Sequence, residues 1–167
     1  NHPAWNTKNS VAWDSSIQGA MELNDILTIN PNVYYFSYST VASVIDTSTG
    51  YYKPADHLNM TNYPLSWIIG RTKVDMGNGE ETDESWFKND GTVNTISMLR
   101  PFTGENGPEP LKTFSDKGPI EKGIWNFMGE YELDHKSFIG IFIDDEKQID
   151  LMMKRFESQA QILHSLK

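Results

Sequence analysis

The chain contains no cysteine, so it can hold neither a disulfide framework nor a metal site built on thiolates. It also lacks any apolar run of the length that a transmembrane helix needs. Basic residues are few, since 14 Lys and Arg stand against 23 Asp and Glu and give a net charge of −9. Nucleic-acid binding needs a basic patch, and adhesion to an anionic membrane needs a polybasic anchor. The sequence therefore disfavours both of these classes.

What is present is sufficient for a globular fold. The chain has 167 residues, of which 38% are hydrophobic and 12% aromatic. This length and composition would suffice for one domain with a core, and we assign residues 1–167 to part of a single domain. The first residue is Asn1 and no signal peptide follows it, so we expect a cleavage product, a fragment or a processed subunit.

The order of the predicted elements indicates an α/β fold. The segment 33–40 is rich in Tyr, Phe and Val and predicts a strand that is buried on both faces, as in a largely parallel sheet covered by helices. Apolar residues at helical spacing predict an amphipathic helix over 144–166, with its Met and Phe stripe in the core. Further expectations are a helix over 16–29, an irregular surface segment over 41–63, a short helix or buried segment over 64–70, a loop over 101–119 and a last strand over 124–128.

Two loops carry residue types that suit general base catalysis. Asp90 lies in the turn-like sequence NDGTV, and His135 follows the predicted last strand. A catalytic histidine needs a carboxylate on its second ring nitrogen, and in α/β-hydrolases the acid precedes the histidine along the chain. However, NDG is also an ordinary turn sequence, and a single histidine is usually structural. The spacing alone favours the structural interpretation, and Asp134 competes with Asp90 as the partner of the histidine.

Several sequence segments occur in the same order in a known family. Together they resemble the C-terminal part of the staphylococcal and Geobacillus-type secreted lipases, over nearly the whole chain except about 41–85. The long run that ends in Asp134 and His135 is the most specific of them. The segments are GIWNFMGEYELDH at 123–135, NDGTVNTISM at 89–98, NPNVYYFSYST at 30–40, GAMELN at 19–24 and HPAW at 2–5.

The resemblance implies a fold and an activity. It implies the C-terminal portion of an α/β-hydrolase fold, a mixed and mostly parallel sheet with covering helices, completed by a missing N-terminal half. It also implies a secreted carboxylic ester hydrolase, a triacylglycerol lipase acting on lipid or ester substrates. Asp90 and His135 would be the acid and the base of a Ser-Asp-His triad. The serine is expected in the missing half, because GxSxG is absent from the sequence.

The resemblance also bears on metal ions, although the chemistry itself requires no cofactor. Asp14 matches one ligand of the family's structural zinc site, whose other ligands are expected in the missing half; the alternative is that Asp14 caps a helix. Ser137 and Phe142 stand where the family has two acidic calcium ligands. A calcium site needs several oxygen ligands, so we expect this one to be absent or rebuilt.

A different class of function stays open at this point. A non-catalytic binding or structural protein could retain a lipase-like frame. The lack of a recognisable nucleophile and the altered calcium positions favour that alternative, whereas the retained Asp90 and His135 disfavour it. A standalone metal-dependent hydrolase is disfavoured, because the sequence has no HExxH motif.

Overall fold

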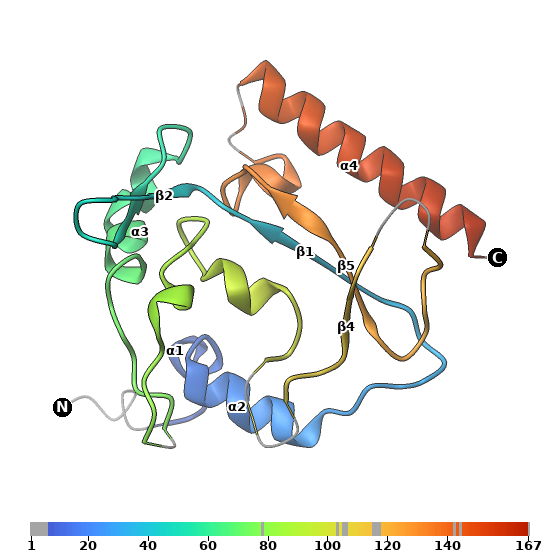
Figure 1. Cartoon of the computed structure of the whole chain (residues 1–167), viewed down its shortest axis with the longest axis horizontal. Coiled ribbons are helices and arrows are strands. Elements are labelled where there is room, and N and C mark those ends of the chain that lie inside the picture. Colours follow the sequence, from blue (N-terminus) through green and yellow to red (C-terminus); the bar gives the residue numbers. More distant parts are fainter. Residues whose placement is uncertain are drawn as a thin grey trace. The chain divides into compact units, whose positions relative to one another are not determined.

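The computed structural model describes residues 7–77, 79–102, 104, 107–114, 118–141, 143 and 145–166 (Figure 1). The chain divides into two compact units. The first unit comprises Asn1–Ser39, Lys73–Trp86 and Ile96–Gly129; the second comprises Thr40–Thr72, Phe87–Thr95 and Glu130–Lys167.

Two short helices follow each other near the start of the first unit, α1 (Val11–Asp14) and α2 (Ile17–Ile26). Each begins with a serine cap: Ser10 Oγ accepts the N–H of Trp13, and Ser16 Oγ accepts the N–H of Gly19. The helix predicted over 16–29 is therefore confirmed in its start but ends earlier, because Leu27 is extended. The alternative that Asp14 caps this helix is wrong, since Ser16 fills the capping position and Asp14 is the last residue of α1.

A three-stranded sheet has the order β1-β5-β4, with β1 (Tyr35–Thr40), β4 (Leu111–Thr113) and β5 (Trp125–Tyr131). Strand β4 runs parallel to β5, with Leu111 opposite Trp125. The two longer strands confirm the strands predicted over 33–40 and 124–128. The loop predicted over 101–119 is wrong at β4, because three residues are too few to show the alternation that identifies a strand.

The most buried residues of β1 are not its aromatic ones. Ser37, Ser39 and Thr40 are buried, whereas Tyr35, Phe36 and Tyr38 are half-buried. The predicted strand exists, but small hydroxyl side chains occupy its inaccessible positions.

The second unit contains a hairpin that was not predicted from the sequence. Strand β2 (Ser43–Ile45) pairs antiparallel with β3 (Tyr52–Pro54), and helix α3 (Tyr63–Ile69) follows them. The irregular segment predicted over 41–63 is therefore wrong at both strands, which are too short to display a clear pattern. Of the two alternatives predicted over 64–70, a short helix or a buried segment, the helix is the one that forms, with a proline in its first turn, where the missing N–H does no harm.

The C-terminal helix α4 (Glu146–Ser165) confirms the predicted amphipathic helix, and Asp145 caps it by accepting the N–H of Gln148. The prediction that its apolar stripe forms core is wrong within the described part of the chain. The buried residue of α4 is instead Arg155, which lies over the ring of Phe138 at 4.2 Å and donates to its carbonyl. The exposed apolar residues are Ile149 (38%), Met153 (49%), Phe156 (46%) and Leu163 (52%).

In the described ranges, the remaining helical elements are single 3-10 turns. Among the described helices, none is both long and apolar enough to cross a bilayer.

Buried apolar side chains of the second unit form its core: Val41, Ala42, Ala55, Leu58, Phe87 and Leu133. The turns are η2 (Met60–Asn62), η3 (Glu84–Trp86), η4 (Thr95–Met98) and η5 (Ser137–Ile139).

Asn126 on β5 offers a test of how the first unit is held together. Its side chain is 1% exposed, and Nδ2 donates to the carbonyls of Tyr35, Glu121 and Ile124 at 3.0, 2.9 and 3.2 Å. We expect Asn126→Leu to lower the free energy of unfolding by about 2–4 kcal/mol, because buried carbonyls lose their donor. Urea unfolding measures this loss, with the exposed Asn9→Leu as the control. Equal effects of the two substitutions would contradict the role given to Asn126.

Candidate active site

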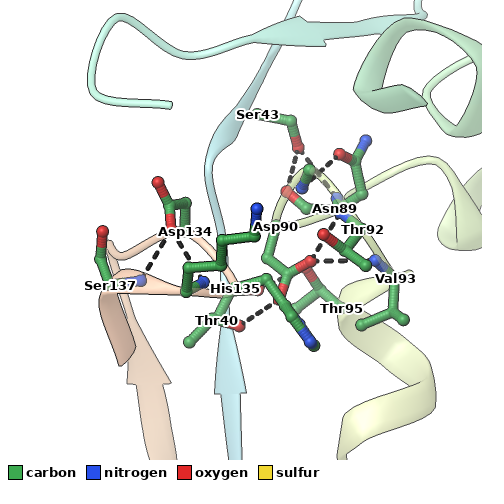
Figure 2. Close-up of polar contacts among 12 residues, drawn as sticks. Thr40, Ser43, Asn89, Asp90, Thr92, Val93, Thr95, Asp134, His135 and Ser137 are labelled. Carbon is green, nitrogen blue, oxygen red and sulfur yellow. Dashed lines mark hydrogen bonds and ion pairs between the residues drawn. The ribbon is translucent and has the colours of Figure 1, made fainter. Parts of the chain in front are cut away.

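The loop that carries Asp90 is anchored by the residue before it. Asn89 is fully buried, and its side-chain oxygen accepts the Ser66 hydroxyl at 2.8 Å and the Gly91 N–H at 3.0 Å. Its main chain exchanges two hydrogen bonds with the Ser43 hydroxyl, at 2.8 and 2.9 Å (Figure 2). The start of β2 and helix α3 therefore fix the turn from both sides.

The next position of the turn requires glycine. Gly91 has φ of 92°, in the left-handed region that side chains disfavour. A Cβ atom there would lie 2.4 Å from Leu58 Cδ1, far inside normal contact. The NDG sequence is thus a turn, as the structural interpretation proposed, but it is a turn that presents a carboxylate.

The Asp90 carboxylate is fully buried and receives four hydrogen bonds (Figure 2). Oδ1 accepts the N–H groups of Thr92 at 3.0 Å and Val93 at 2.9 Å. Oδ2 accepts the Thr40 hydroxyl at 2.8 Å and the ring of His135, through Nδ1, at 2.9 Å. A carboxylate removed from water needs such donors to keep its charge, so this environment suits the ionised form.

His135 is held at one edge of its ring and open at the other. Its main-chain N–H donates to the carbonyl of Asp90 at 3.2 Å, and its side chain is 47% exposed. Because the carboxylate accepts, Nδ1 carries the proton in the neutral ring and Nε2 carries the lone pair. Among the residues that the structure describes, Nε2 has no hydrogen-bond partner. The arrangement can accept a proton at Nε2 and stabilise the resulting cation through Asp90.

Asp134 has a different task, although it precedes the histidine directly. Its carboxylate is 2% exposed and accepts main-chain N–H groups from Lys136 at 2.9 Å, Ser137 at 2.8 Å and Asn59 at 3.2 Å. These bonds fix the loop after His135 and tie it to the segment around Asn59. The structure therefore pairs the His135 ring with Asp90, whereas the catalytic roles of the two residues stay predictions.

The hydrogen bond that His135 Nδ1 donates to the Asp90 carboxylate raises the pKa of His135 above its ordinary value of about 6.5. Partial burial of the ring opposes this rise, because it disfavours the charged form. The negative charges of Asp90 and then of Asp134 raise the pKa further, whereas Lys136 lowers it. The net effect is a ring that holds its proton to a higher pH than a free histidine.

Asp14, the predicted zinc ligand, has few potential metal-binding groups near it in the described part of the chain. Asp14 is exposed in the first unit, and within the described ranges no three residues of the types His, Cys, Asp or Glu group as a metal site. Asp14 therefore supplies at most one of the four ligands of a zinc site.

The predicted calcium positions fit the ion no better. Ser137 is buried and donates its N–H to Asp134, whose oxygens already hold three N–H groups. Asp145 caps α4. Phe142, and the nearby Asp144, lie outside the described residues. The absence of the family's calcium site therefore stays a prediction.

Two residues of this site, Thr40 and Asn89, were not predicted from the sequence. Thr40 is separated from Asp90 by 50 positions, so no local pattern links the two residues. Asn89 stood in the recognised NDGTV sequence, but its burial and its bonds to Ser43 and Ser66 depend on the fold.

The family model for the C-terminal domain of lipase-like proteins matches residues 1–164 of this chain. Lipase 2 of Staphylococcus aureus is 30% identical over 146 residues, which cover 86% of this chain and 19% of that protein. The chain thus spans about a fifth of the length of this curated relative.

Solved structures are similar to the chain as well. The crystal structure of Staphylococcus hyicus lipase matches with a TM-score of 0.78 at 24% identity, over 96% of this chain and 38% of that one. EstA from Clostridium botulinum matches with a TM-score of 0.73 at 31% identity, over 85% of this chain and 33% of that one. The predicted fold class, the C-terminal portion of an α/β-hydrolase fold, agrees with these neighbours.

The bond between His135 and Asp90 predicts a specific titration. We expect the pKa of His135 to lie above about 6.5, and Asp90→Asn to lower it, because this substitution removes the largest cause of the rise. Protonation of this ring therefore contributes stability below pH about 6.5, which is lost as the pH rises through the folded-state pKa. NMR titration of the ring carbons measures both values, and His135→Gln assigns the signal. The same pKa in the parent and in Asp90→Asn would contradict the prediction.

Proposed function

Because the chain belongs to the family of lipase-like C-terminal domains, we propose that it supplies the acid and the base of a Ser-Asp-His triad in a carboxylic ester hydrolase. The observation that carries the proposal is the 2.9 Å hydrogen bond between His135 Nδ1 and Asp90 Oδ2, with Nε2 left open. This is the tautomer and orientation that a general base requires. Triacylglycerols are the proposed substrate class, since Lipase 2 and the S. hyicus protein are lipases by name.

The proposed reaction proceeds by acyl transfer in two halves. A serine hydroxyl attacks the ester carbonyl while His135 Nε2 takes its proton, and Asp90 stabilises the imidazolium that forms. His135 then returns the proton to the oxygen of the leaving alcohol, and an acyl-enzyme remains. In the second half His135 activates water in the same way, so that the carboxylic acid leaves and the serine recovers its proton. Because the base must be neutral, activity is expected to rise with pH through the pKa of His135.

The serine is proposed to come from an upstream half of the same α/β-hydrolase domain. GxSxG is absent from the 167 residues, and the chain covers 38% and 33% of the two solved structures. The upstream half would also complete the oxyanion hole and supply the remaining ligands of a zinc site that includes Asp14. The proposed location is extracellular, as the resemblance to secreted lipases implies.

His135 is expected to be essential for ester hydrolysis in the full-length protein. Without its base the serine hydroxyl remains a weak nucleophile, so His135→Ala should lower kcat/KM by on the order of 10³-fold or more. Turnover of p-nitrophenyl esters measures the loss, with circular dichroism to verify folding. The exposed His164→Ala on α4 is the matched control and should retain parental turnover. Activity of His135→Ala within a few-fold of the parent would rule out the triad.

Asp90, and not Asp134, is expected to orient the base. Asp90→Asn should lower kcat by roughly 10³–10⁴-fold, because an amide cannot stabilise the imidazolium and favours the wrong tautomer. Asp134→Asn keeps an oxygen that can accept main-chain N–H groups, so we expect its main effect on thermal stability. Steady-state kinetics and melting curves of both variants separate the two roles. If Asp134→Asn alone abolished turnover, the assignment would have to be reversed.

A further inference from the structure

We propose that Thr40 is a positioning residue of this site, which sets the direction in which Asp90 presents Oδ2 to His135. The kinetic part of the inference rests on the proposed function, whereas the geometric part does not. The main support for this proposal is the 2.8 Å hydrogen bond from Thr40 Oγ1 to Asp90 Oδ2, the same oxygen that contacts His135 Nδ1 (Figure 2). Thr40 is 3% exposed, so water does not compete for this bond.

The Thr40 hydroxyl comes from the end of a strand, and hydrogen bonds fix the backbone that carries it. Thr40 is the last residue of β1, and the N–H of the following Val41 donates to the carbonyl of Tyr131, at the end of β5, at 2.9 Å. The carbonyl of Thr40 accepts the hydroxyl of Thr95 at 2.8 Å. A β-branched side chain has few χ1 choices, so a fixed backbone also fixes its hydroxyl. Thr40 therefore contacts Asp90 Oδ2 from a backbone that is anchored to β5 as well as to Thr95.

The two oxygens of Asp90 are held by different parts of the protein. Oδ1 is held by the N–H groups of Thr92 and Val93, which belong to the same turn as Asp90 and would move with it. These bonds hold Oδ1 but do not by themselves fix where Oδ2 lies relative to the sheet. Thr40 is the donor to Oδ2 that comes from a strand, so it defines the carboxylate plane relative to the sheet. A tilt of that plane would misdirect Oδ2 from His135 Nδ1 and weaken the orientation of the base.

The alternative is that the hydroxyl only satisfies a buried acceptor and adds to stability. The chain offers a matched control for that case. Thr82 is likewise 3% exposed, and its hydroxyl accepts the N–H of Val74 at 2.9 Å, but it does not contact Asp90 or His135. Replacing either threonine with valine removes one buried hydroxyl at nearly constant volume. A purely structural role predicts the same kind of loss from both changes.

The test compares Thr40→Val, Thr40→Ser and Thr82→Val in the full-length protein that contains this chain. We expect Thr40→Val to lower kcat about 10- to 100-fold with KM within about twofold, since a hydrogen bond to a charged group is removed. Thr40→Ser should recover most of kcat, because it restores the hydroxyl. Thr82→Val should lower the melting temperature and leave kcat at the parental value.

A second measurement does not depend on activity. The Nδ1–H proton of a histidine that is hydrogen-bonded to a carboxylate gives a signal far downfield in the proton NMR spectrum. The variant His135→Gln assigns this signal. We expect Thr40→Val to shift or broaden it, and Thr40→Ser and Thr82→Val to preserve it. If the parent hydrolyses no ester, the proposed function fails and this signal still decides the role of Thr40.

Three results would overturn the positioning role. The first is a Thr40→Val variant with an unchanged Nδ1–H signal and kcat within about twofold of the parent. The second is an equal loss of kcat in Thr82→Val, which would show a general effect of destabilisation. The third is a Thr40→Ser variant as impaired as Thr40→Val, which would assign the effect to the lost methyl group.

Discussion

The buried charge of Asp90 is the constraint on which the rest of the site depends. A carboxylate with no exposed surface is unfavourable unless donors replace the water it has lost, and here four donors do so. Two of them are main-chain N–H groups, which reach the carboxylate only while the turn keeps its shape. That shape in turn needs the buried Asn89 side chain and a glycine at position 91. The architecture around the acid thus follows from keeping one negative charge out of water.

Asp90 and Asp134 have different roles, because their carboxylate oxygens accept hydrogen bonds from different donors. Asp90 offers one oxygen to its own turn and the other to His135 and Thr40, so it acts on a ring. Asp134 offers both oxygens to main-chain N–H groups and so acts on a loop. The two carboxylates have similar burial, yet their chemistry differs because their donors differ. The proposed acyl transfer uses the first, and the second keeps the histidine loop in place for it.

The sequence predicted the long elements and the two loops of the site, because these leave local signals. The period of α4 and the aromatic run of β1 were sufficient to locate both, and a motif resemblance singled out Asp90 and His135. The sequence could not predict which face of α4 is buried. The helical period of its apolar residues shows that they share one face, but it does not show what that face packs against. The donor from Thr40 was equally inaccessible, since it depends on a contact across 50 residues. Strands β2, β3 and β4 were missed because three residues carry almost no pattern.

The turn at Asn89 also bears on the chemical ageing of the polypeptide. An aspartate followed by glycine is prone to succinimide formation, in which the glycine nitrogen attacks the side-chain carbonyl carbon and isoaspartate results. In the folded chain the Gly91 nitrogen is committed to Asn89 Oδ1 at 3.0 Å, and the Asp90 carboxylate is held by its four donors. The contacts that aim the acid at His135 therefore also protect its covalent structure. Local opening of this turn would expose Asp90 to irreversible isomerisation, so the lifetime of the site is linked to how rarely the turn unfolds.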